Sequence, residues 1–426
     1  MNHVHRLLLD CLAHDTPAAA TARLQSFTAS DWDGVVRAAL GYNLAPQLYH
    51  RLKPFFDAGP VPPQMRQRLQ EAYYLNAGRN MRLYLQLGTL LRCFHDAGAP
   101  VILLKGAHLA EIVYGNVALR PMGDIDLLVR HADLLRAHEV LAGQGYANAE
   151  KNTGHALGHL PPYVKKHAPA IEIHYNICGP PFSDRFAVGD LWERARPASV
   201  QAEAALTLCP EDLVLHLCVH AAVDHGLEMG PLPFFDLART LAYYRNHISW
   251  GSLLGRAEQW SLKRCLLLML YLSESMAGLV LPQEVRSAGM PDAPSGHELA
   301  AARELVFERA TPVASDIARL FGGESISAKL GYCLRQIVPS GRIMRIVHPQ
   351  SRGRLALLIQ YCARFRGMLQ KQGAIVWRLL MRDKEIVRFA QIENKRNQLK
   401  DWITDKGRQG KTQLKKKQKT DSGQNR

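Results

Sequence analysis

Short strand-like runs and helical patterns alternate over about a hundred residues that lie between two long helical regions. Up to about Ala97, and again from Pro210 to about Gln398, apolar residues recur at the spacing of amphipathic helices. Between these regions, Val101–Leu104 and Asp124–Val129 are short apolar runs next to glycine or proline, which is typical of strands. We therefore predict an α+β fold in which a small mixed-sheet domain is flanked by helical N- and C-terminal regions.

Changes in composition divide the chain into four predicted parts. A helical region spans 1–97, a small α/β domain spans 98–204, and a second helical region spans 205–400. The last part, 401–426, is rich in Lys, Gln, Gly and Thr and almost free of apolar residues, so we expect it to be a disordered basic tail.

About a third of the net charge of +15 lies in this tail, so the folded part is less basic than the total suggests. The tail either binds nucleic acid or lipid phosphate weakly and without specificity, or serves only to keep the chain in solution. The segment Arg352–Arg382 mixes basic and apolar residues. It fits a helix that lies on an anionic membrane surface, or a core helix with a solvated outer face.

The remaining composition excludes several classes of protein. The eight cysteines include no Cys-x-x-Cys pair, which argues against a disulfide framework and against a zinc ribbon. The first ten residues carry no sustained apolar run, and the apolar stretch Leu266–Leu281 is short and interrupted by Glu274. We therefore expect a cytoplasmic protein with no secretory signal and no transmembrane segment.

Asp124 and Asp126 are the most informative pair of residues. Side chains alternate along a strand, so both carboxylates point to one face while Ile125 points to the core. Two neighbouring carboxylates repel each other unless a cation lies between them, and oxygen ligands suit Mg²⁺ or Mn²⁺. Glu172, on the predicted strand Ala170–Ile177, is a candidate third ligand. The alternative is a solvated pair at a strand edge.

Lys105, Gly106 and Arg120 are candidates for binding a triphosphate. The Lys-Gly pair follows the first predicted strand, where a glycine lets backbone N–H groups approach a phosphate. Lys105 and Arg120 supply the positive charge. The alternatives are a solvated lysine at a strand end and a loop salt bridge between Arg120 and Asp124.

The segments Leu103–Tyr114 (LLKGAHLAEIVY) and Leu119–Val129 (LRPMGDIDLLV), with Ala170–His174 (AIEIH), resemble a bacterial nucleotidyltransferase family of the DNA polymerase β-type superfamily. The similarity extends over roughly Arg68 to Tyr244. It implies a transferase that uses ATP or another nucleoside triphosphate.

The resemblance also implies roles for individual residues. Gly106 takes the place of the turn glycine, Asp124 and Asp126 take the catalytic and metal-binding positions, and Glu172 takes that of the third carboxylate. Two departures weaken the match: Ala107 stands where the superfamily has Ser or Gly, and Glu172 is longer by one methylene than the usual Asp.

Three histidines are further candidates. His174 shares the predicted face of Glu172, where it either contacts the nucleotide or acceptor or has a structural role. His216 and His220 lie four residues apart on a predicted helix. They fit a zinc site, a cleft-lining position in which His216 binds a substrate phosphate, or ordinary packing.

The leading hypothesis is a Mg²⁺- or Mn²⁺-dependent nucleotidyltransferase that moves an NMP from an NTP to an acceptor and releases pyrophosphate. The acceptor is a small molecule, a peptide or protein, or a tRNA. A second hypothesis is a catalytically inactive protein that keeps this fold and binds nucleic acid or a membrane surface. A third, a metal-dependent phosphohydrolase, explains the carboxylates but not the Lys-Gly turn.

Overall fold

The computed structural model describes 1–12, 17–57, 59–148, 158–179, 182–183, 185–290, 292–308 and 384–404, with the isolated positions 355, 358, 359, 362 and 366. The predicted basic tail and the segment Arg352–Arg382 lie almost wholly outside these residues. The chain divides into two compact units, one built mainly on Met1–Phe307 and the other on Glu308–Asp401. The sheet and the candidate site belong to the first unit.

Short N-terminal helices form the first core. They are α1 (His3–Leu12), α2 (Pro17–Gln25), α3 (Ala29–Gly41), α4 (Ala45–Leu52) and the 3₁₀ turn η1 (Lys53–Phe55). Thr28 caps α3 because its hydroxyl accepts from the Asp31 N–H, while the Asp31 carboxylate accepts from the Thr28 N–H. The buried side chains of α1, α3 and α4 pack together with Leu69 from the next helix.

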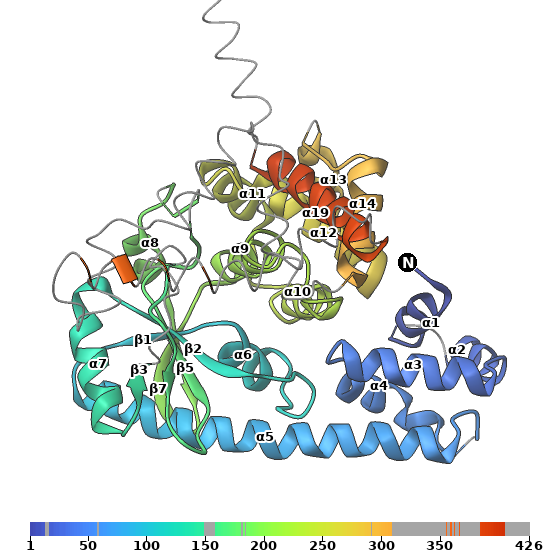
Figure 1. The fold of residues 1–426 in the computed structure, drawn as a ribbon, viewed down its shortest axis with the longest axis horizontal. Helices are drawn as coiled ribbons and strands as arrows, with labels where there is room; N and C mark the ends of the chain where they lie inside the picture. The colour runs from blue at the N-terminus through green and yellow to red at the C-terminus, as the bar shows by residue number, and fades with distance from the viewer. Residues whose placement is uncertain are drawn as a thin grey trace, which may run out of the picture. The chain divides into compact units, whose positions relative to one another are not determined.

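That next helix, α5 (Pro63–Asp96), is 34 residues long and contributes to two cores. Its first half packs on α3 and α4, and its second half, from Leu83 to Phe94, packs on the sheet. Figure 1 shows α5 as one continuous helix that runs from below α3 and α4 to below the strands. Since α5 belongs to both cores, it fixes the position of the sheet relative to the N-terminal helices.

The sheet has seven strands in the order β3-β4-β5-β2-β1-β7-β6. The strands are β1 (Val101–Leu103), β2 (Asp124–Val129), β3 (Ala147–Asn148), β4 (Tyr163–Val164), β5 (Ala170–His174), β6 (Arg196–Val200) and β7 (Glu203–Thr207). The pairs β2–β5 and β1–β7 are parallel and the others are antiparallel. The predicted α+β fold with a mixed sheet and helical flanks is therefore confirmed.

The strands of the structure differ in part from those predicted. The predicted strands Pro161–Val164 and Ala170–Ile177 are shorter in the structure, where they are β4 and β5. The hairpin of β6 and β7 was not predicted. Its two-residue turn, Gln201-Ala202, has φ values of +54° and +63°. Such turns usually contain glycine or asparagine, so the sequence carries no hairpin signal here.

Further helices lie between and after the strands along the chain, and of these α6 (Lys105–His108) packs on β2. Those within the sheet region are α6, the π-helical turn η2 (Leu109–Val113), η3 (His131–Asp133), α7 (Leu134–Gly143) and α8 (Val188–Glu193). Those after it are α9 (Pro210–Val219), the π-helical turn η5 (His220–Asp224), α10 (Leu232–Tyr243), α11 (Trp250–Gln259), α12 (Lys263–Ala277), α13 (Gln283–Gly289), α14 (Gly296–Phe307) and α19 (Lys384–Ile403). None of the described helices has the length and apolar character needed to cross a membrane.

Candidate active site

The parallel pairing of β2 with β5 brings four polar side chains to one face of the sheet. Asp126 is the partner of Glu172 in the register, while Asp124 precedes Asp126 by two residues and His174 follows Glu172 by two. Because side chains alternate along a strand, residues two apart share a face. Ile125, Ile171 and Ile173 point to the opposite side and are buried in the core.

Asp126 is the centre of the polar cluster. Its Oδ1 accepts hydrogen bonds from Lys105 Nζ at 2.6 Å and from His174 Nε2 at 2.9 Å. Glu172 Oε2 lies 3.5 Å from His174 Nε2 and 3.9 Å from Lys105 Nζ. Only 3% of the Asp126 side chain and 12% of the Lys105 side chain are exposed. The cluster is therefore held in a largely dry site, where charges act strongly on each other.

The charges of the cluster stabilise one another. Burial would raise the pKa of Asp126, but the Lys105 ammonium and the His174 hydrogen bond hold it well below its usual value. Burial would likewise lower the pKa values of Lys105 and His174, yet both are raised by the neighbouring carboxylates. Asp126 is therefore an anion, and Lys105 is its internal cation.

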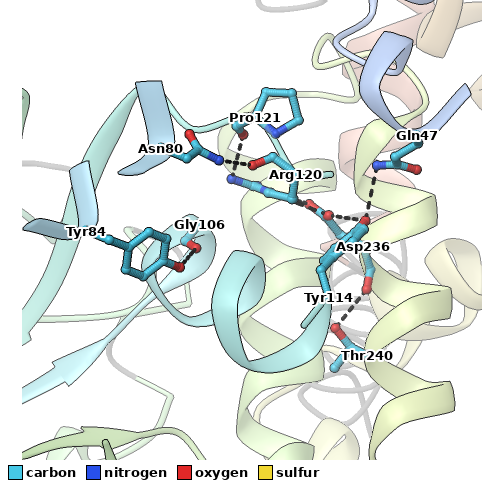
Figure 2. Close-up of polar contacts among 9 residues, drawn as sticks. All are labelled: Gln47, Asn80, Tyr84, Gly106, Tyr114, Arg120, Pro121, Asp236 and Thr240. Atoms are coloured by element: carbon cyan, nitrogen blue, oxygen red, sulfur yellow. Dashed lines mark hydrogen bonds and ion pairs between the residues drawn. The ribbon is translucent and has the colours of Figure 1, made fainter. Parts of the chain in front are cut away.

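The backbone that presents Lys105 is held by α5. Lys105 has φ +42°, a left-handed conformation that is costly for a residue other than glycine. The Tyr84 hydroxyl contacts the carbonyls of Gly106 and Ala107 at 3.3 and 3.1 Å and accepts from the Glu111 N–H at 3.0 Å. Figure 2 shows the Tyr84 side chain directed at Gly106. This contact keeps the strained turn in place.

Gly106 is required by packing. A Cβ at this position would lie 2.6 Å from Arg120 Nη1 and 2.8 Å from Met122 Cγ. These two side chains take the space beside the Gly106 Cα. The predicted approach of a phosphate to the Gly106 backbone stays a prediction.

Gly106→Ala is expected to lower the free energy of unfolding by about 1–3 kcal/mol, because the new methyl group must displace a buried guanidinium. Gly123→Ala is the matched control, since its Cβ would meet nothing within 4 Å. Urea unfolding of both variants measures the difference. Equal midpoints for the two variants would show that the packing at Gly106 is loose.

Among the described residues, Arg120 pairs with a residue that was not predicted. Its guanidinium forms an ion pair with Asp236 on α10 at 3.0 Å, and its Nη1 donates to the Pro121 carbonyl. The Tyr114 hydroxyl donates to the same Asp236 carboxylate at 2.8 Å. Figure 2 shows Arg120 and Tyr114 converging on Asp236. Arg120 therefore joins the loop before β2 to the C-terminal helices, in place of the predicted salt bridge with Asp124.

Asn80 fixes the other side of this loop. Its amide donates to the carbonyls of Val117 and Arg120 at 2.6 and 2.8 Å, and Asn76 donates to Ala118 O at 2.7 Å. The sequence prediction missed these residues. A signal was present, because Asn76, Asn80 and Tyr84 recur every four residues and so interrupt the apolar face of α5 with polar groups.

His216 lies on α9 near the cluster. Its Nδ1 hydrogen-bonds to Ile177 O at 3.0 Å, while its buried Nε2 has no partner within the described residues. Burial, reinforced by the positive charges of Lys105 and His174, lowers the pKa of His216 to about 3. The ring is therefore neutral near pH 7, with one nitrogen left for a hydrogen bond.

A comparison with known families now adds to this geometry. The sequence model of a family described as uncharacterised nucleotidyltransferases matches residues 28–278, which is more than half of the 426 residues. The protein belongs to this nucleotidyltransferase family. The matched range contains the whole sheet, the Asp126 cluster and His216. No curated protein and no solved structure matches the chain significantly.

The Asp126 cluster of this family member fits a divalent cation. One ligand atom each from Asp126, Glu172 and His174 lie within 4.8 Å of one another, and this is the one such group among the described residues. Two carboxylates and an imidazole suit Mn²⁺ at least as well as Mg²⁺. The predicted ligand set was Asp124, Asp126 and Glu172. The structure brings His174 into the group, places Asp124 just outside it, and leaves His216 and His220 out.

The negative charge of Asp124 is disfavoured by its surroundings. Burial, together with repulsion by Asp126 and Glu172, raises its pKa from 3.8 to about 6. Because the folded-state pKa is the higher one, ionisation of Asp124 opposes folding. Its contribution to stability is therefore lost as the pH rises from about 4 to about 6.

Asp124→Asn is expected to stabilise the metal-free protein at pH 7 by up to about 3 kcal/mol relative to wild type, and to have little effect at pH 4. The measurement is urea unfolding of both proteins with a chelator, from pH 4 to pH 7. A difference between the two proteins that does not vary with pH would contradict the raised pKa.

Proposed function

We propose that this protein is a nucleotidyltransferase that uses Mg²⁺ or Mn²⁺ to transfer an NMP from an NTP to an acceptor hydroxyl or phosphate. The observation that carries the proposal is the β2–β5 register, which sets Asp126 beside Glu172 with Asp124 on the same face. Membership of the family supports the same reaction class. The strained backbone of Lys105 adds support, since such strain is common at active sites.

The reaction is a displacement at the α-phosphorus. An acceptor oxygen forms a bond to this phosphorus, the bond to the β-phosphate oxygen breaks, and pyrophosphate leaves. We assign the acceptor's proton to Glu172, whose side chain is 23% exposed against 3% for Asp126. A bound divalent cation supplies positive charge that offsets the charge of the phosphates.

Asp126, Glu172 and His174 would hold the cation, with Asp124 beside them. With a cation held by Asp126 and Glu172, Lys105 would no longer be their main counter-ion, and its ammonium could contact the triphosphate. Neutral His216 donates its one ring proton from Nδ1 to the Ile177 carbonyl, so its Nε2 would accept a hydrogen bond from a hydroxyl of the nucleotide or acceptor rather than donate to a phosphate. We leave Arg120 out of this contact, because Asp236 engages its guanidinium.

The experiment is incubation with each α-³²P-labelled NTP and Mg²⁺ or Mn²⁺, in the presence of a nucleotide-free cell lysate as the source of acceptors. Calorimetry measures metal-dependent NTP binding in parallel. We expect the wild type to transfer label and Asp126→Asn to transfer none. Asp96→Asn makes the same chemical change at an exposed position and should transfer label like the wild type. The absence of both transfer and metal-dependent binding would exclude the enzyme.

One observation favours the second candidate, a catalytically inactive member that binds without transferring. Lys105 already neutralises Asp126, so this carboxylate is stabilised without any metal ion. Such a protein would bind nucleic acid or an anionic membrane through its basic C-terminal region. Binding that survives Asp126→Asn but is lost on truncation at Asp401, with no label transfer, identifies this case.

A further inference from the structure

A cavity of about 570 Å³ lies apart from the Asp126 cluster, in the same unit. It is enclosed by α4, α10, Tyr114, the segment that joins α10 to α11, and the end of α12 with the residues that follow it. Its volume falls within the range of about 300–1,000 Å³ that is usual for small-molecule pockets. No residue of the Asp126 cluster lines it.

The wall of the cavity is mainly apolar. Phe235 and Leu241 line it from α10, Ile248 and Trp250 from the segment before and at the start of α11, and Leu279 and Val280 from the segment after α12. Val280 is 85% exposed. An exposed aliphatic side chain beside an apolar hollow indicates a surface that a ligand can cover.

Three arginines, Arg51, Arg239 and Arg245, also line the cavity, and no Asp or Glu is among its lining residues within the described chain. Arg239 and Arg245 are exposed, and neither forms a hydrogen bond or ion pair with another described residue. Guanidinium groups gathered around an apolar hollow repel one another. An anion among them would remove this repulsion and accept their hydrogen bonds.

The hydroxyl of Tyr114, in the wall of the cavity, is already hydrogen-bonded to other side chains. Tyr114 lines the cavity, but its hydroxyl donates to Asp236 at 2.8 Å and accepts from Gln47 Nε2 at 3.3 Å. Figure 2 shows Gln47, Tyr114 and Asp236 in this chain of contacts, with Thr240 bonded to the Asp236 backbone. Tyr114 therefore offers its aromatic ring to a ligand, and the cationic groups that line the cavity to meet an anion are the arginines, with the His50 ring beside them.

We propose that this cavity is a second ligand site, which binds an organic anion made of an apolar body and one carboxylate, sulfonate or phosphate group. The apolar body fills the space between α10 and the segment after α12, and the anionic group contacts Arg239 and Arg245. This site is independent of the proposed transferase reaction.

The experiment titrates the full-length protein with decanoate and with decanol by calorimetry. We expect one saturable site for decanoate and binding at least about tenfold weaker for decanol, which lacks the charge. Arg239→Gln and Arg245→Gln are each expected to weaken decanoate binding about tenfold, whereas Arg82→Gln, an exposed arginine on α5, leaves it unchanged.

A second set of variants tests the location. Ala242 lines the cavity and is exposed, so Ala242→Trp fills the space without disturbing the core and should abolish both decanoate binding and the rise in Tm that decanoate causes in wild type. Asp126→Asn should bind decanoate normally, which separates this site from the transferase site. Equal affinity for decanol, or decanoate binding that is indifferent to Arg239→Gln, Arg245→Gln and Ala242→Trp, would overturn the proposal.

Discussion

Asp126→Asn is expected to reduce metal-dependent NTP binding and label transfer by at least about 100-fold. Mutation of a group that only hydrogen-bonds a metal ligand already lowers metal affinity or activity by about 10- to 100-fold, and Asp126 is itself a candidate ligand. The substitution removes the negative charge from the carboxylate that lies nearest to both Lys105 and His174, at 2.6 and 2.9 Å, and that also belongs to the metal-ligand set. Calorimetry with Mn²⁺ and NTP measures the binding, and the labelled-nucleotide assay measures transfer.

The same change leaves the largely buried Lys105 without its nearest anion, with Glu172 at 3.9 Å as the remaining one among the described residues. Removal of one partner from a buried ion pair typically costs about 3–5 kcal/mol, so the variant should unfold at a lower urea concentration. The double variant Lys105→Met/Asp126→Asn separates the two effects. It should regain much of the lost stability, since no buried charge is left unpaired, and still bind no metal. Metal-dependent NTP binding by a stable double variant would remove Asp126 from the proposed site.

Asp236→Asn is expected to lower the free energy of unfolding by about 3–5 kcal/mol. The Asp236 side chain is 4% exposed, and its carboxylate is the partner of both the Arg120 guanidinium and the Tyr114 hydroxyl. Burial would lower the pKa of Arg120, but Asp236 raises it, so the guanidinium stays charged and needs this anion. Urea unfolding measures the loss.

Two comparisons make the Asp236 result specific. Asp33→Asn breaks the exposed pairs with Arg37 and Arg68 and should move the urea midpoint far less, because solvent screens both pairs. Arg120→Met/Asp236→Leu removes both buried charges and should recover a large part of the stability lost in Asp236→Asn. A midpoint for Asp236→Asn equal to that of wild type would mean that the Arg120–Asp236 pair does not hold the loop to α10.

Much of the candidate site follows from local patterns. The alternation of Asp124, Ile125 and Asp126 places two carboxylates on one face of any strand, whatever its neighbours. The alternation of Glu172 and His174 with Ile171 and Ile173 does the same on a second strand. The fold class and the family follow likewise from these motifs and from the helical texture around them, and the family match confirms the resemblance to nucleotidyltransferases. The predicted division at 97, 204 and 400 stays a prediction.

The partners of the charged residues do not follow from local patterns. Arg120 and Asp236 are 116 positions apart, and Asp126 and His174 are 48 apart. Which acid pairs with which base depends on strand order and helix packing, and these are decided by the burial of apolar surface over the whole chain. Local patterns are enough to place carboxylates, a lysine and a histidine on the strand faces and turns of the sheet. That Lys105 and His174 share Asp126, while Arg120 pairs with Asp236 on α10, depends on the packed core, because the packing sets the distances between the charged groups.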